Sequence, residues 1–188
     1  MIKHVDIYSL SDYSKHLKNL TPEDKMSRFG HAMNDYGIDQ LILQMIYNSK
    51  DHELWTCTVG DEIVGWGHMA KSSEAWELAV SVNKEHQRKG IGNKLILDMM
   101  TWAKFHHVPE VFMHCIEDNK VIQHLALKNE LKTRERGYGE RTAAIQLSEP
   151  TLLESNTQLF KEQADILAEI ASLRMRLTNL WLNPTHTL

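Results

Sequence analysis

The chain has 188 residues, of which 42% are hydrophobic and 24% are charged, and this is enough to bury one substantial core. The formal net charge of -4 argues against a nucleic-acid binder that is held by phosphate contacts. No apolar run approaches the length of a membrane span, and the first residues lack the apolar core of a signal peptide. We therefore expect a cytoplasmic protein without nucleic-acid or membrane partners, with Cys57 and Cys115 reduced and buried.

The first half of the chain predicts a strand, three helices and a hairpin. In chain order we expect a strand over 4–8, a helix capped by Ser11 or Asp12 and ending near 19, a helix over 21–29, a helix over 35–46, and strands over 54–59 and 63–69. The second helix has the clearest start, because Thr21 is a capping residue and Pro22 suits the first helical position. Gly60 lies between the two strands, as is typical of a hairpin.

The second half alternates strands and helices. We expect a strand over 76–82, a helix over 93–105, and one or two final strands within 133–147 that bend at 137–139. Strands followed by alternating helices and strands indicate an α/β fold with a mixed sheet and helices on both faces.

The segment that joins the strand over 76–82 to the next helix reads Val-Asn-Lys-Glu-His-Gln-Arg-Lys-Gly-Ile-Gly and ends at Gly92. Its two glycines let the backbone turn with its N–H groups inward, and the helix dipole adds partial positive charge there. The segment therefore predicts a cradle for a diphosphate. No Lys-Ser or Lys-Thr follows Gly92, and Leu95 occupies the place of a third glycine, so neither a triphosphate loop nor a dinucleotide fingerprint is indicated.

The pattern Val-x4-Gln-x2-Gly-x-Gly on a strand, loop and helix resembles the acyl-CoA site of the GNAT superfamily of N-acyltransferases. Residues 77–82 are similar to the fourth strand of that family, 111–115 to its fifth, 117–129 to the helix that follows, and 20–30 to a segment between its first helices. The resemblance covers the chain from Met1 to about Leu147. It implies a GNAT domain over 1–148 with a mixed, mostly antiparallel twisted sheet.

The resemblance also implies an acetyl-CoA-dependent N-acetyltransferase that acts by direct attack in a ternary complex, without a metal. The acceptor can be a polyamine, an amino acid, an aminoglycoside-like compound or a protein lysine. The implied cofactor-binding residues are Val80, Ser81, Val82, Gln87, Arg88, Lys89, Gly90, Ile91, Gly92, Asn93 and Asn119. An alternative is a non-catalytic acyl-CoA-binding module, a sensor or scaffold that assembles through its C-terminal helix.

Glu77 matches the strand carboxylate that often serves this family as general base, although a solvent-exposed strand glutamate is an equally good interpretation. The family often protonates the departing thiolate with a tyrosine on the helix after the fifth strand, and here Ala126 stands at that position. Tyr138, His114 and His124 are candidate replacements, and a thiolate of low pKa can also leave unaided.

The eleven histidines do not predict a metal site. His106 and His107 are adjacent and so cannot point to one ion from a helix, and no pair has His-x3-His spacing or a Cys-x2-Cys partner. No Gly-x-Ser-x-Gly elbow of a hydrolase occurs either.

Residues 149–188 lie outside the resemblance and form a C-terminal helical extension. Apolar residues recur there at heptad spacing over 156–182, which predicts one long amphipathic helix with the stripe Leu159, Ile166, Ile170, Leu173, Leu177 and Leu180. The mixed charges of the other face indicate a solvated surface. The helix either folds over its own domain or pairs between two subunits, and we expect a homodimer formed through it.

Overall fold

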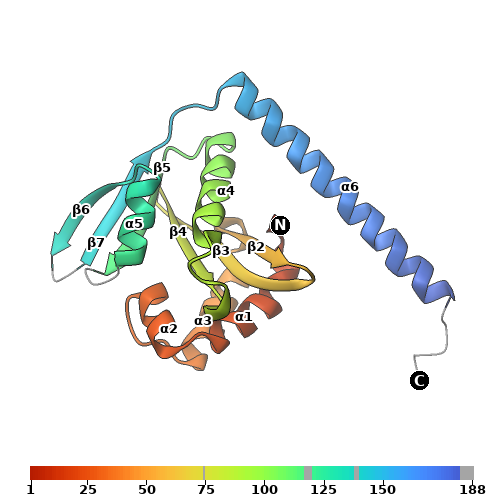
Figure 1. Cartoon of the computed structure of the whole chain (residues 1–188), viewed down its shortest axis with the longest axis horizontal. Coiled ribbons are helices and arrows are strands. Elements are labelled where there is room, and N and C mark those ends of the chain that lie inside the picture. Colours follow the sequence, from red (N-terminus) through yellow and green to blue (C-terminus); the bar gives the residue numbers. More distant parts are fainter. Residues whose placement is uncertain (74, 117–119, 138–139, 183–188) are drawn as a thin grey trace. The chain divides into compact units, whose positions relative to one another are not determined.

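The computed structural model describes residues 1–73, 75–116, 120–137 and 140–182, which fall into two compact units, Met1–Glu149 and Pro150–Leu188. The first unit contains β1 (Ile2–Val5), α1 (Leu10–Asn19), α2 (Pro22–Phe29), α3 (Asp35–Tyr47), β2 (His52–Val59), β3 (Glu62–Ser72), β4 (Ala75–Val82), α4 (Ile91–Phe105), β5 (Glu110–Ile116), α5 (Lys120–Lys128), β6 (Lys132–Gly137) and β7 (Glu140–Gln146). Within its described residues, the second unit contains one helix, α6 (Leu152–Leu182) (Figure 1).

The strands of the first unit form one mixed sheet, which within the described residues has seven strands in the order β1-β2-β3-β4-β5-β7-β6. Every neighbouring pair is antiparallel except β4 and β5, which run parallel. The chain reaches β5 from β4 through α4, as a parallel connection requires. The mixed, mostly antiparallel sheet that the sequence predicts is therefore confirmed.

Helices cover both faces of this sheet, and each face has its own apolar core. Successive strand residues point to opposite faces, so Trp55 packs with α4 whereas its neighbour Leu54 packs with α1 and α3. The α4 side of the core includes the fully buried residues Leu95, Ile96 and Met99. We call the other side, on which α1, α2 and α3 lie, the α2 face.

The helix starts show where local sequence signals hold and where they fail. Thr21 caps α2 as predicted, because its hydroxyl accepts the N–H of Asp24 at 3.1 Å, and α2 ends before Gly30 in the left-handed conformation. The predicted cap of α1 at Ser11 or Asp12 is wrong. That helix begins at Leu10 after a 3-10 turn over Ile7–Ser9, in which Asp6 accepts the N–H of Tyr8.

Cys57 is a free and buried thiol, as expected, and the side chain of Cys115 lies outside the described residues. Among the helices that the structure describes, none combines the length and the apolar character needed to cross a bilayer. The predicted helix over 156–182 is present and starts four residues earlier, at Leu152.

Candidate functional site

The strands β4 and β5 separate shortly after they meet. β4 pairs with β3 along its whole length, but its pairing with β5 covers only Ala75–Glu77 against Glu110–Phe112. β5 then continues against β7 as far as Ile116. Within the described residues, β4 from Leu78 to Val82 therefore has a free edge, and Figure 1 shows the two strands diverging.

The free edge of β4 presents backbone donors and acceptors. The N–H of Asn83 donates to Val64 O on β3 at 2.9 Å. Because successive N–H groups of a strand point to opposite sides, those of Val80 and Val82 point away from β3, toward the free edge. An extended chain of amides can pair with such an edge as an added strand does.

The N-terminus of α4 adds uncapped N–H groups. Gly90 is its N-cap residue, with φ 80°, and has no side chain to cap the helix. The helical bonds begin with Lys94 N–H donating to Gly90 O at 3.1 Å, so the N–H groups of Ile91, Gly92 and Asn93 precede the first bond. A Cβ placed on Gly90 would meet nothing within 4 Å. This open helix start can bind an anion such as a phosphate.

Gly92 lies where three elements converge. A Cβ added there would meet Leu125 of α5 at 3.6 Å and Val80 of β4 at 3.8 Å. The side chain of Asn93 is held by Asn129, whose amide donates to it at 3.1 Å. The helix start and the free strand edge are therefore neighbours in one site.

The loop before α4 is tied to α2 by Gln87. Its side-chain amide donates one proton to Asp24 at 3.1 Å and the other to Val82 O at 3.1 Å. The next residue, Arg88, is exposed and has a left-handed backbone with φ 61°, and Lys89 is exposed as well. Two cations thus lie in solvent beside the open helix start.

Glu77 is half-buried on β4, opposite Ala70 of β3. Alternation along the strand puts it on the α2 face together with Ser81, whose hydroxyl lies 2.8 Å from His16 Nε2. No hydrogen bond or ion pair of the Glu77 side chain occurs among the residues that the structure describes. Its carboxylate is therefore available to a ligand.

The remaining predicted residues are distributed around β5 and α5. Ala126 is buried on α5, whereas His114 and His124 are exposed. Asn119 and Tyr138 lie outside the described residues.

The α2 face also carries a polar network that sequence reasoning missed, which we call the Arg28 network: Arg28, Tyr13, His68 and His52. Arg28 Nη2 lies 3.2 Å from the Tyr13 hydroxyl and 3.1 Å from His68 Nδ1. His68 Nε2 in turn lies 3.1 Å from His52 Nδ1. The β2–β3 register could have indicated the neighbouring histidines, because it places His68 opposite Leu54 and His52 opposite Ala70.

The arginine fixes the protonation of this network. A guanidinium only donates, so His68 must accept at Nδ1 and donate from Nε2 to His52, and both rings are neutral. Burial lowers the pKa of His68 well below its usual value, and Arg28 and then His52 lower it further. Burial also lowers the pKa of His52, against the opposing effects of Asp51 and Glu53.

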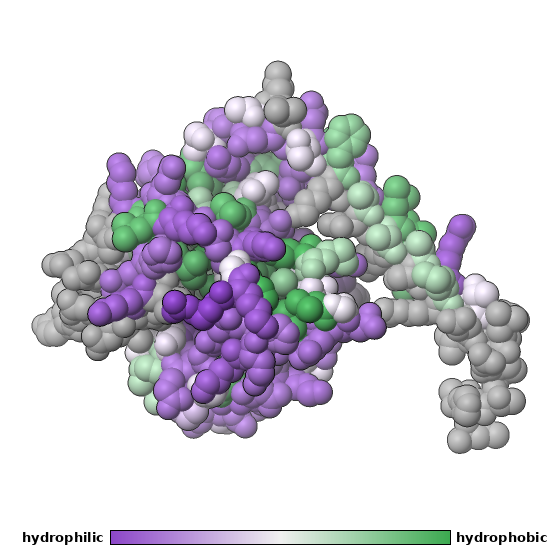
Figure 2. All heavy atoms as spheres, in the orientation of Figure 1, coloured by the Kyte–Doolittle hydropathy of each residue, from purple (hydrophilic) through white to green (hydrophobic). Residues whose placement is uncertain are grey.

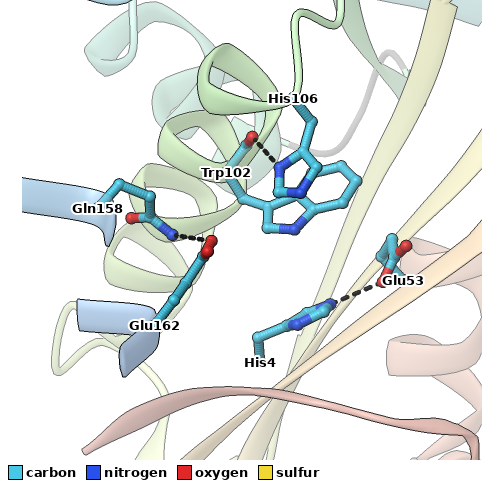
Figure 3. Close-up of polar contacts among 6 residues, drawn as sticks. All are labelled: His4, Glu53, Trp102, His106, Gln158 and Glu162. Atoms are coloured by element: carbon cyan, nitrogen blue, oxygen red, sulfur yellow. Dashed lines mark hydrogen bonds and ion pairs between the residues drawn. The ribbon is translucent and has the colours of Figure 1, made fainter. Parts of the chain in front are cut away.

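Histidines on the α4 side of the sheet have structural partners (Figure 3). His4 lies 2.7 Å from Glu53, and the ring of His106 stacks on Trp102 at 4.0 Å while its Nδ1 donates to the Trp102 carbonyl at 2.9 Å. Within the described part of the chain, no group of three or more His, Cys, Asp or Glu residues is placed to hold a metal ion.

The sequence profile of the acetyltransferase (GNAT) family matches residues 15–129, more than half of the chain. No curated protein matches the chain significantly. Solved structures with a similar fold include the GNAT domain of S. lividans PAT, with a TM-score of 0.64 and 12% identity over 78% of this chain and 89% of that one.

Two further similar structures were solved with coenzyme A. PaiA N-acetyltransferase from Thermoplasma acidophilum has a TM-score of 0.61 and 15% identity, over 78% of this chain and 99% of that one. Spermidine N-acetyltransferase from Vibrio cholerae, solved with CoA and spermine, has a TM-score of 0.61 and 12% identity, over 78% and 94% of the two chains. At these identities the likeness shows a shared fold.

His16 should make the protein sensitive to acid. Burial lowers its pKa to about 4, helped by Arg28 and opposed by Asn83 and Asp24. Between pH 6.5 and 4 the unfolded chain then binds more protons at this residue than the folded chain, so stability falls as the pH falls through that window. The loss from His16 is at most about 3.5 kcal/mol.

A His16→Gln variant keeps a polar partner for Ser81 and lacks this titration. Urea unfolding at pH 7.5 and pH 4.5 should show that the free energy of unfolding falls less between these pH values for the variant than for the wild type. Equal falls would contradict a role of His16 in the acid sensitivity.

Proposed function

Because the chain belongs to the acetyltransferase (GNAT) family, we propose that it is an N-acetyltransferase that moves an acetyl group from acetyl-CoA to an amine by direct attack in a ternary complex. The observation that carries the proposal is the free edge of β4 next to the uncapped start of α4. The free strand edge can pair with a pantetheine arm, and the helix start can bind a pyrophosphate. These two groups are adjacent in CoA. Release of free CoA from acetyl-CoA in the presence of a panel of amines tests the activity.

The described residues fit acetyl-CoA. The N–H groups from Arg88 to Gly92 would hold the pyrophosphate, with Lys89 as a cationic neighbour, and the backbone of Val80 and Val82 would hold the pantetheine. The side chains of Ser81, Gln87 and Asn93 already have partners in the protein, so their part is to position the backbone around the cofactor. Asn119 remains a proposed contact of the pantetheine.

Acetyl-CoA supplies an activated acyl thioester, so the protein needs no covalent nucleophile. We propose that Glu77 is the general base that removes a proton from the attacking amine, directly or through water. Its carboxylate is on β4 and has no partner among the described residues. The N–H of Val80 points to the free edge and is suited to stabilise negative charge on the carbonyl oxygen. Ala126 offers no acid to the departing thiolate.

Replacing Gly90 with valine should weaken CoA binding by at least about tenfold, since a side chain there blocks approach to N–H groups whose hydrogen bonds to a charged acceptor contribute about 1.5 to 3 kcal/mol each. Gly60→Val is the matched control, because Gly60 also has positive φ and nothing within 4 Å of a Cβ but lies in the β2–β3 hairpin. Titration calorimetry with CoA compares the two. Unchanged affinity in Gly90→Val would place the phosphates elsewhere.

Replacing Glu77 with glutamine should lower turnover by about 10²- to 10⁴-fold while CoA affinity stays nearly the same. The loss should be largest at low pH, where most of the amine is protonated. Turnover is measured as thiol release across pH 6 to 9, and CoA affinity by calorimetry. A variant as active as the wild type at every pH would remove Glu77 from the mechanism.

We also propose that the protein is a homodimer formed through α6. Its described stripe residues Leu159, Ile166, Ile170 and Leu173 are 46 to 56% exposed, and Figure 2 shows hydrophobic side chains along the helix. The side chains of Leu177 and Leu180 lie outside the described residues. An apolar stripe of heptad spacing is what pairs helices between subunits, and a second copy presents the same stripe.

Light scattering should find a dimer for the full chain and a monomer for a chain that ends at Glu149, the boundary between the two units. A double change, Ile166→Glu with Ile170→Glu, should also give a monomer because it charges the stripe. Ala168→Glu is the control on the outer face of the same turns and should remain dimeric. A monomeric full chain, or a dimer that survives truncation, would contradict this interface.

A further inference from the structure

Arg28 is a cation without a counter-charge. Among the described residues no carboxylate lies within ion-pair distance of it, and Nη2 is bonded to the Tyr13 hydroxyl and to a neutral His68. Its Nε is buried and has no hydrogen-bond partner there. The guanidinium carbon lies 5.0 Å from the centroid of the Phe29 ring, a cation–π contact that supplies no counter-charge.

The nearest acid on the same helix is already engaged. Asp24 precedes Arg28 by one turn, a spacing that commonly forms an ion pair. Instead one of its oxygens accepts from Gln87 at 3.1 Å and the other from Thr21 at 2.9 Å. The sequence thus holds a suitable partner at the right spacing, and the fold directs it to the loop before α4.

Arg28 and the proposed base lie on the same face of the sheet. His68, which contacts Arg28, faces Ala79 across the β3–β4 ladder, and Glu77 lies two residues from Ala79 on the same face. Residues in such a diagonal relation are about 7 to 8 Å apart. Helix α2 packs against β4, and Figure 1 shows it beside the lower end of that strand, which leads to α4. A cation and an anion therefore share one face within the span of a small molecule.

Partly buried cations are stabilised by a carboxylate more than by neutral partners. We propose that the acceptor supplies this carboxylate, so that the substrate is a small amino acid whose amine meets Glu77 and whose carboxylate binds Arg28. This rests on the proposed N-acetyltransferase function and selects one of the acceptor classes that the sequence leaves open. A polyamine is disfavoured, because it would bring further positive charge to Arg28.

The test compares acceptors in matched sets: lysine with its carboxamide and with cadaverine, glycine with glycinamide, and spermidine as the polycation. Wild-type kcat/KM should favour each acid over its amide by about 10- to 100-fold, the equivalent of about 1.5 to 3 kcal/mol for a charged hydrogen bond. Arg28→Met should abolish this preference while turnover of the amides stays within about threefold. Comparison of variant and wild type on the same pair cancels the difference in amine basicity.

Three further variants separate charge from structure. Arg28→Lys should keep part of the preference because it keeps the charge. Tyr13→Phe removes one neutral partner of Arg28 and should leave the preference intact, as should Lys18→Met, which removes a cation that pairs with Asp39 on α3. CoA affinity and thermal unfolding of each variant check that the fold is retained.

Equal kcat/KM for acids and amides, a preference that survives Arg28→Met, or spermidine as the best acceptor would overturn the proposal while leaving the acetyltransferase function in place. If no amine is acetylated, the proposed function fails. The carboxylate site is then tested separately, by calorimetric measurement of the affinity of the CoA-loaded protein for lysine and for its carboxamide. Tighter binding of the acid that is lost in Arg28→Met supports the site, and equal binding overturns it.

Discussion

Three residue pairs hold β4 to β5, and then the two strands separate. Backbone N–H and C=O groups left unpaired in the middle of a sheet are costly unless water or a ligand bonds them, at about 1 to 3 kcal/mol for each buried group. The separation of β4 from β5 after Glu77 therefore leaves an unpaired strand edge in the interior of the sheet. α4 begins at the end of this edge, where Gly92 lies close to Val80 of β4 and Leu125 of α5.

The two faces of β4 have different chemistry because side chains alternate along the strand. Trp76, Leu78, Val80 and Val82 pack toward α4 and belong to the apolar core. Glu77 and Ser81 point to the opposite face, where His16, His52 and His68 gather around Arg28. Burial lowers the pKa of all three imidazoles, and Arg28 lowers the pKa of His16 and of His68 further.

Sequence reasoning succeeded where the signal is local. Thr21 and Pro22 start α2, and Gly30 ends it, through backbone preferences that act within one turn of helix. The strand, loop and helix around Gly90 and Gly92 were also predictable, because these elements are adjacent in the chain. The start of α1 was missed, since the turn at Asp6 ends β1 early and lets the helix begin before its polar residues.

What the sequence could not provide depends on strand register. The face of Glu77 follows from its pairing with Ala70, and the Arg28 network joins residues that are 40 and 16 positions apart in the chain. No spacing rule links such residues, because a shift of one residue in the β2–β3 register would put the two histidines on opposite faces of the sheet. The end of β4–β5 pairing is likewise a property of the assembled sheet.

The hydrogen bond from Gln87 to Asp24 has a thermodynamic consequence. Asp24 also accepts the hydroxyl of Thr21, the residue that caps α2, so the glycine loop and the helix that carries Arg28 share one hydrogen-bonded unit. Any ligand that orders the loop through this unit also lowers the free energy needed to order α2. Linkage makes that effect reciprocal. A ligand bound at the glycine loop would strengthen binding at α2, and a ligand bound at α2 would strengthen binding at the loop by the same factor.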